Sequence, residues 1–415
     1  MRLNLRMRWV ALAAIAGLAA MTGCAEKDDT LTDIDTDPPV VSSVSEDAGR
    51  VSWDTDEGAE CVLLYGSRTG TYNHYGYSVY DGGRAHYVDL IDIEPDTYYF
   101  RIMATDRAGN SMTTEEMTYE ISEVPSTENL IYTMVDVGWG DCHFVECPNG
   151  TNIIVDSGYG AIGEYPHSAD VDQFLLARGV AGGSAIDYMV CTHAHADHYG
   201  YFLGLLPRFP QTHFLAPGQS YSSVWDQLDD VLTSPSTMKD SLAEGQTNHT
   251  VDFLKWDEEH DVQVKCLSAG AGRLIPDGLA GDPINNDSAV LKITYGQVDI
   301  ILGGDAEEFV EQRMVKAYGN EMDVEVFKVG HHANNDASSP EYLEAISARV
   351  GFIPNSLEEN PGVFDQEIID RLRAYGVDYY VSDRAYMNGA RNDEPVYGHL
   401  SVSTDGETYT VWSWK

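Results

Sequence analysis

Basic residues are scarce in this chain of 415 residues: 25 Lys and Arg stand against 67 Asp and Glu, for a formal net charge of −42. Proteins bind nucleic acid mainly by neutralising its phosphates with Lys and Arg. No run of basic residues follows residue 8, so the charge disfavours long nucleic acid as a partner. Hydrophobic residues make up 43% of the chain, enough to build cores and to exclude wholesale disorder.

Long apolar runs are also missing, apart from one near the N-terminus. Three arginines lie within the first eight residues, Trp9–Met21 is apolar, and small residues lead to Cys24. Stable spanning of a bilayer takes about 20 apolar residues, so this shorter run has the layout of a secretory signal. It resembles a bacterial lipoprotein signal, which implies removal of residues 1–23 and a lipid on Cys24; simple secretion is the alternative. We expect an exported protein held at the cell envelope by its lipid alone, on the outer membrane in a Gram-negative source.

Cysteines are few and lack the C-x-x-C spacing of structural zinc sites. With Cys24 assigned to the lipid, five remain, an odd number. A disulfide framework is therefore not expected, and we interpret the five as small apolar residues of the cores.

The N-terminal third predicts an all-β domain over residues 37–123, after an acidic linker at 24–36. Short alternating runs separated by Gly and Asp turns are typical of strands with one buried face. The segments 93–98 and 106–110 resemble a fibronectin type III domain. In that comparison Trp53 is the core tryptophan and Tyr98 the corner tyrosine. Such a domain implies a spacer or an adhesive module that binds a protein partner.

Residues 128–415 predict one large α/β domain. Pro148-Asn149-Gly150 between two apolar runs indicates a hairpin, and helical spacing places Val171, Phe174 and Leu175 on one face. The predicted strands are 130–137, 143–146, 151–156, 186–191, 288–294, 298–302, 324–329, 379–381 and 400–403, with further helices around 224–232 and 368–372.

The segment from His193 to His198 carries the chemistry. It places His193, His195, Asp197 and His198 within six residues, directly after an apolar strand. Residues two apart in an extended loop point the same way, so the first two imidazoles can hold one ion and the Asp–His pair a second. Two ions about 3.5–4 Å apart are used in hydrolysis. A polar loop that happens to be rich in histidine is the alternative.

This pattern, His-x-His-x-Asp-His, resembles the signature of the metallo-β-lactamase fold superfamily. More closely, the ordered motifs resemble the hydrolase domain of the ComEC competence proteins. These motifs are 135–141, 152–158, 285–291, 302–305 and 328–332. The resemblance covers the chain from about Leu130 onward and implies an αββα sandwich with two divalent metal ions at the strand ends.

The resemblance also implies roles for individual residues. His193 and His195 would bind the first ion, Asp197, His198 and His331 the second, and Asp305 would bridge the two. Asp156 would orient the histidine loop. An Asp close to a glycine can instead simply end a strand, which is the competing explanation for Asp156 and Asp305.

Two positions depart from the simplest pattern. Strand alternation favours His331 as the ligand and leaves His332 to support it or to contact substrate. Many members of the superfamily have a further histidine where this chain has Ile-Asn-Asn at 284–286, so the first site is expected to have three protein ligands, to bind its ion weakly or to be empty. Asn285 would support the site or contact substrate. His213 and His399 are less favoured substitutes. Imidazole and carboxylate ligands suit Zn²⁺, with Mn²⁺ and Fe as alternatives.

The implied activity is metal-dependent hydrolysis of a phosphodiester or related ester. A metal lowers the pKa of its bound water from 15.7 to about 7, and Asp197 would orient this nucleophile. The charge favours a small or cell-envelope ester over long nucleic acid. The alternatives are a nuclease of the ComEC type and a non-catalytic, metal-containing adhesion or binding lipoprotein.

Overall fold

The computed structural model describes residues 35–78, 83–90, 93–122, 128–159, 168–183, 185–210, 212–217, 228, 232, 238–355, 365–382 and 398–413. The expected signal segment, Cys24, most of the acidic linker and most of the helix expected at 224–232 lie outside these residues. Among the described residues, no helix is both long and apolar enough to cross a bilayer.

The N-terminal region is all β, as its alternating pattern predicts. One sheet has the order β1-β2-β5, and β4-β3-β6-β7 face it, with β8 also paired to β6. The bounds are β1 (Val41–Asp47), β2 (Arg50–Thr55), β3 (Ala59–Gly66), β4 (His74–Ser78), β5 (Ala85–Asp89), β6 (Asp96–Asp106), β7 (Ser111–Thr113) and β8 (Met117–Ile121). Trp53 is buried between the sheets, and the Tyr98 hydroxyl donates to Glu94 O at 3.0 Å. Both residues lie where the fibronectin comparison implies, although the resemblance itself stays a prediction.

Two sheets stack face to face in the rest of the chain. In the first, the order is β14-β13-β12-β11-β10-β9-β21-β22; the second has the order β15-β16-β17-β18-β19-β20. The first comprises β9 (Leu130–Met134), β10 (His143–Glu146), β11 (Asn152–Val155), β12 (Tyr188–Val190), β13 (His213–Ala216), β14 (Met238–Ser241), β21 (Leu400–Thr404) and β22 (Thr408–Ser413). The second comprises β15 (Gln263–Ser268), β16 (Val290–Tyr295), β17 (Val298–Leu302), β18 (Val326–Lys328), β19 (Val350–Ile353) and β20 (Asp378–Val381).

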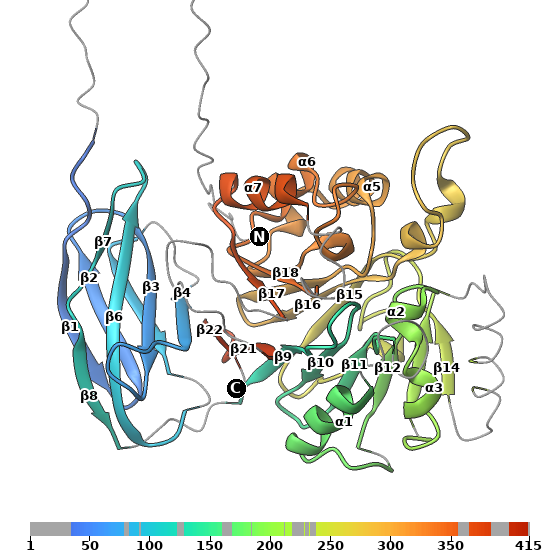
Figure 1. The fold of residues 1–415 in the computed structure, drawn as a ribbon, viewed down its shortest axis with the longest axis horizontal. Helices are drawn as coiled ribbons and strands as arrows, with labels where there is room; N and C mark the ends of the chain where they lie inside the picture. The colour runs from blue at the N-terminus through green and yellow to red at the C-terminus, as the bar shows by residue number, and fades with distance from the viewer. Residues whose placement is uncertain are drawn as a thin grey trace, which may run out of the picture.

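Helices cover the outer faces of both sheets (Figure 1). The first sheet carries α1 (Ser168–Ala177), α2 (Ala196–Tyr199) and α3 (Phe202–Leu205), and the second carries α5 (Glu308–Tyr318), α6 (Pro340–Ile346) and α7 (Gln366–Ala374). One apolar core joins the sheets, with Tyr132 from the first and Phe352 from the second, and each helical layer has a core of its own. The predicted αββα arrangement is therefore confirmed.

Local signals explain several of these elements. Val171, Phe174 and Leu175 are the buried residues of α1, as their spacing predicts. β10 and β11 pair antiparallel across the predicted turn, in which Gly150 has φ 87. The five described cysteines are all buried and free, which confirms their apolar role.

The N-terminal region is joined to the α/β region by a continuous sheet. β4 pairs antiparallel with β22, placing His74 opposite Trp412. The Tyr77 hydroxyl lies 2.8 Å from that of Tyr380, and Arg349 forms an ion pair with Glu60. Figure 1 shows β4 beside β22 at the edge of the larger region. The all-β region is thus packed against the α/β region and not merely tethered to it.

Candidate metal centre

Loops at the ends of five strands converge at one edge of the stacked sheets. They follow β9, β11, β12, β17 and β18. The loops after β12, β17 and β18 bring together seven residues from three separate segments of the sequence. We call these residues the histidine cluster: His193, His195, Asp197, His198, Asp305, His331 and His332. The structure thus places every predicted metal ligand in one locality, although the roles themselves stay predictions.

Asp156 organises the loop that carries the first four residues of the cluster. It follows β11 with φ 57, a left-handed conformation that Asp tolerates better than most residues. Its carboxylate accepts from Thr192 N at 2.8 Å and from Thr192 Oγ1 at 2.7 Å. The same carboxylate lies 2.8 Å from Nδ1 of His198. This is the placement expected of a residue that fixes the ring of a metal ligand.

Four donor atoms on one side of the cluster have the spacing of a metal site. Nε2 of His198 lies 3.0 Å from Asp305 Oδ2, and Nε2 of His332 lies 3.3 Å from the same oxygen. Asp197 Oδ2 lies 3.5 Å from His332 Nε2 and 3.9 Å from His198 Nε2. Tetrahedral bonds of about 2.0–2.2 Å place ligand atoms roughly 3.3–3.6 Å apart. The four distances are thus close to those of a tetrahedral site, and His198, Asp305 and His332 also form, with Asp141, a buried group that could hold a metal ion.

His193 and His195 form a second group beside Asp305, and the ring of His193 lies 4.0 Å from that of His198, measured between centroids. Nε2 of His193 lies 3.2 Å from Nδ1 of His195 and 3.9 Å from Asp305 Oδ2. The two rings are two residues apart in an extended loop, as the sequence predicts. Asp305 Oδ2 lies within reach of both groups, where a bridging oxygen would have to be.

Hydrogen bonds on the far side of the rings show why the cluster fits a cation. Nδ1 of His198 faces Asp156, and Nδ1 of His332 lies 2.8 Å from Pro354 O. Carboxylate and carbonyl oxygens only accept, so each neutral ring carries its proton on Nδ1. The Nε2 lone pairs then face Asp305, another acceptor, and Nε2 of His332 is buried without a hydrogen bond. A positive charge, from protons or a metal ion, has to lie between these atoms.

The pKa shifts have the same cause. Burial alone would lower the pKa of His198, but neighbouring carboxylates, Asp305 first among them, outweigh it and raise this pKa. Burial alone would raise the pKa of Asp305 and that of Asp197, but His198 lowers both. Burial and the nearby His198 lower the pKa of His193, which stays neutral and suited to ligation.

His331 and His332 take positions different from those that strand alternation predicts. His332 is fully buried against Asp197 and Asp305, whereas His331 is partly exposed and its Nε2 lies 3.9 Å from Asp305 Oδ2. The prediction assigned His331 to the ion beside Asp197. Its premise fails because β18 ends at Lys328, and His331, His332 and Ala333 all have left-handed backbone, with φ 41, 53 and 65. Alternation holds only in extended chain.

Two buried residues that the sequence analysis did not assign to the site, Lys328 and Asp141, contact the histidine cluster. Nζ of Lys328 lies 2.9 Å from Asp305 Oδ1 and 3.0 Å from Asp141 Oδ2, and none of these side chains is more than 2% exposed. Asp141 also lies 3.3 Å from Nδ1 of His332. The lysine therefore occupies one Asp305 oxygen and leaves Oδ2 for the histidines. A lysine ending an apolar strand next to the 330–332 motif was the available signal.

Asn285 is held in place by a carboxylate that the sequence did not single out. Its Nδ2 donates to Glu307 Oε1 at 3.0 Å, and Asn286 Nδ2 donates to Glu307 Oε2 at 2.6 Å. Nδ2 of Asn285 is also 3.5 Å from Nε2 of His331. Asn285 thus borders the cluster at His331, and its role stays a prediction.

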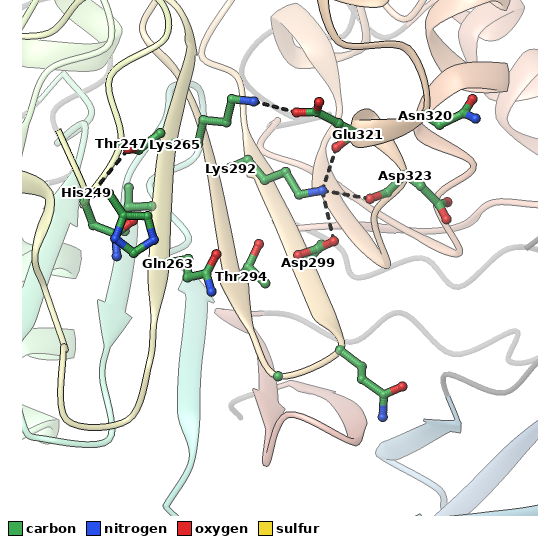
Figure 2. Close-up of a pocket in the computed structure, with 14 residues that line it drawn as sticks. Thr247, His249, Gln263, Lys265, Lys292, Thr294, Asp299, Asn320, Glu321 and Asp323 are labelled. Carbon is green, nitrogen blue, oxygen red and sulfur yellow. Dashed lines mark hydrogen bonds and ion pairs between the residues drawn. The ribbon is translucent and has the colours of Figure 1, made fainter. Parts of the chain in front are cut away.

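A separate hollow of about 400 Å³ lies over β15 and β16. Figure 2 shows that its charged side chains pair with one another: Lys265 with Glu321, and Lys292 with Asp299. None of its lining residues belongs to the histidine cluster.

The two histidines considered as substitutes have other contacts. His213 pairs with Asp240, and His399 accepts a hydrogen bond from Asp136 N at 2.9 Å.

The sequence matches a known family over the segment that contains the histidine cluster. The family model of the metallo-beta-lactamase superfamily matches residues 135–354. The chain belongs to this superfamily. Members of the metallo-beta-lactamase superfamily are generally hydrolytic metalloenzymes that bind divalent metals.

Two relatives match more than half of the chain. The chain is 24% identical over 257 residues to ComE operon protein 3 of Bacillus subtilis, covering 59% of this chain and 30% of that protein. It is 22% identical over 263 residues to competence protein ComA of Neisseria gonorrhoeae, covering 63% of this chain and 32% of that protein. The matched part spans about a third of the length of these relatives.

Two solved structures, one of them described as a metallo-beta-lactamase fold protein, are also similar. YhfI of Bacillus subtilis matches with a TM-score of 0.41 and 11% identity, over 63% of this chain and 99% of YhfI. Zinc-bound PqqB of Methylobacterium extorquens matches with a TM-score of 0.39 and 11% identity, over 62% of this chain and 99% of PqqB.

Proposed function

We propose that this protein is a metal-dependent hydrolase that acts on a phosphodiester or a related ester. One observation carries the proposal: buried imidazole nitrogens with fixed Nδ1 partners face Asp197 and Asp305 at distances of 3.0–3.9 Å. Two divalent ions held there would supply an activated water and positive charge for the attacked centre. In this assignment the first ion would be held by His193 and His195. The second ion would be held by Asp197, His198 and His332, and Asp305 would contact both ions.

The chain's own residues prepare this site for a nucleophile. Nε1 of Trp139 donates to Asp197 Oδ2 at 3.1 Å, which fixes the carboxylate. The lowered pKa of Asp197, which His198 causes against the effect of burial, keeps it ionised and able to accept a proton from water. Gly140, with φ 122, lets the loop after β9 pass close to the backbone of Asp197, because a Cβ at this position would lie 2.5 Å from Asp197 O. Asp197 is therefore the residue that we assign to orient the nucleophile.

Charge guides the choice of substrate. A net charge of −42 would repel a long polyanion unless cations screen it, so a small diester or a cell-envelope polymer fits better than long nucleic acid. A nuclease is the second candidate, because one relative is named competence protein ComA and another recombination protein 2. The lipid on Cys24 would place the activity at the cell envelope.

Metal analysis combined with turnover of bis(p-nitrophenyl) phosphate tests the proposal. The wild-type protein should bind two equivalents of metal and hydrolyse the diester, and chelation should abolish turnover. His195→Ala should lose one equivalent and most of the activity. His249→Ala, at an exposed histidine beside the hollow of Figure 2, is the control and should behave as wild type. Full metal loading without activity on diesters, nucleic acids or lactams would instead indicate a binding protein.

A further inference from the structure

The first ion has few protein ligands in the assignment above. His193, His195 and the shared Asp305 supply three donors, whereas His332 completes the set around the second ion. Asn285 stands where the family resemblance implies a histidine, and its amide nitrogen is engaged by Glu307 at 3.0 Å. The chain therefore either leaves this position open or fills it from elsewhere.

His331 lies where it can fill this position. Its Nε2 is 3.9 Å from Asp305 Oδ2, the same distance as Nε2 of His193. It is also 3.5 Å from Asn285 Nδ2, so it borders the residue that replaces the histidine. The left-handed backbone at His331 and His332 sends the two rings apart, with centroids 6.1 Å from each other. Two adjacent residues can then serve two different ions.

The hydrogen bonds of His331 prepare its ring for ligation. Nδ1 lies 2.8 Å from Asp336 Oδ1, which places the proton on Nδ1. Nε2 is then the acceptor nitrogen; it meets only a long contact of 3.5 Å from Asn285 Nδ2, which a metal ion would replace. Glu307 also lies near His331, and together with Asp336 it could form a separate cation site. Both Glu307 oxygens already accept amide protons from Asn285 and Asn286, so this carboxylate is committed to positioning.

We infer that His331 is the third imidazole ligand of the first ion, in place of the histidine that Asn285 replaces, with Asp336 orienting its ring. The inference rests on the proposed metal centre and names the residue that completes it. It separates the roles of two neighbouring histidines: His331 serves the first ion and His332 the second.

Cobalt titration of the metal-free full-length protein, followed by calorimetry and visible absorbance, tests this assignment. His195→Ala marks the equivalent that belongs to the first ion, and His332→Ala marks the second. His331→Ala should weaken the same equivalent as His195→Ala by about 100-fold or more. Asp336→Asn, which keeps the shape of the side chain, should weaken it about 10–100-fold. His260→Ala is the matched control. Nδ1 of His260 also faces a carboxylate, that of Asp257 at 2.9 Å, but neither residue belongs to the histidine cluster.

A double-mutant comparison decides between the two ions. If His331 serves the first ion, His195→Ala/His331→Ala should still bind the second equivalent as tightly as His195→Ala alone. Wild-type affinity for both ions in His331→Ala, or loss of the equivalent that His332→Ala loses, would overturn the inference. Failure of the wild-type protein to bind cobalt at all would instead overturn the proposed function.

Discussion

Lys328→Met should destabilise the protein more than any ordinary loss of a charge pair. The ammonium group is fully buried between Asp141 and Asp305, at 3.0 and 2.9 Å. Burial alone would lower the pKa of Lys328, but these carboxylates outweigh it and raise the pKa, so the group is charged in the folded state. Methionine keeps most of the volume and leaves two buried carboxylates without their cation. Removing one partner of a buried pair costs about 3–5 kcal/mol, a large part of a typical stability of about 5–15 kcal/mol.

Urea unfolding followed by tryptophan fluorescence, in chelator and in metal, measures this loss. In chelator we expect the free energy of unfolding to fall by about 3–5 kcal/mol. The loss should shrink when metal is present, because ions beside Asp305 supply positive charge and bind only the folded state. Lys265→Met is the control: its partner Glu321 is 70% exposed (Figure 2), and such pairs contribute about 0–1 kcal/mol. A loss below about 1 kcal/mol for Lys328→Met would refute the reasoning.

Three other changes test separate parts of the structure. Asp156→Asn should lower metal affinity about 10–100-fold in calorimetry, because it alters the acceptor that orients His198. Unchanged affinity would show that Asp156 does not support metal binding. Gly140→Ala should lower both stability and turnover, since its Cβ would meet Asp197 O at 2.5 Å at φ 122; wild-type melting and rates would contradict this. Burial lowers the pKa of His74 to about 4. The folded state therefore binds fewer protons than the unfolded state between pH 6.5 and 4, and stability is lost as pH falls through this window. His74→Phe should remove up to about 2–3 kcal/mol of that loss, and an unchanged pH profile in acid melts would exclude His74 as its source.

Local signals were sufficient for the parts of the centre that lie within one segment. His193 and His195 share a side of the loop because they are two residues apart in extended chain, and Asp197 and His198 follow where α2 begins. The helix face of α1 and the hairpin at Gly150 were predictable for the same reason, since periodicity and turn residues act over a few positions.

The sequence by itself predicted nine strands of the α/β region, the histidine loop and the superfamily, because each depends on neighbouring residues and ordered motifs. It did not predict β13, β14, β15, β19 or β22. Only the tertiary structure decided which of His331 and His332 meets Asp197, because three left-handed residues replace the extended chain that alternation assumes. It alone paired Lys328 with Asp141, which is nearly 200 residues away, and β4 with β22, which are more than 300 residues apart. Such partners are chosen by the packing of whole sheets, and no local pattern of residues records that choice.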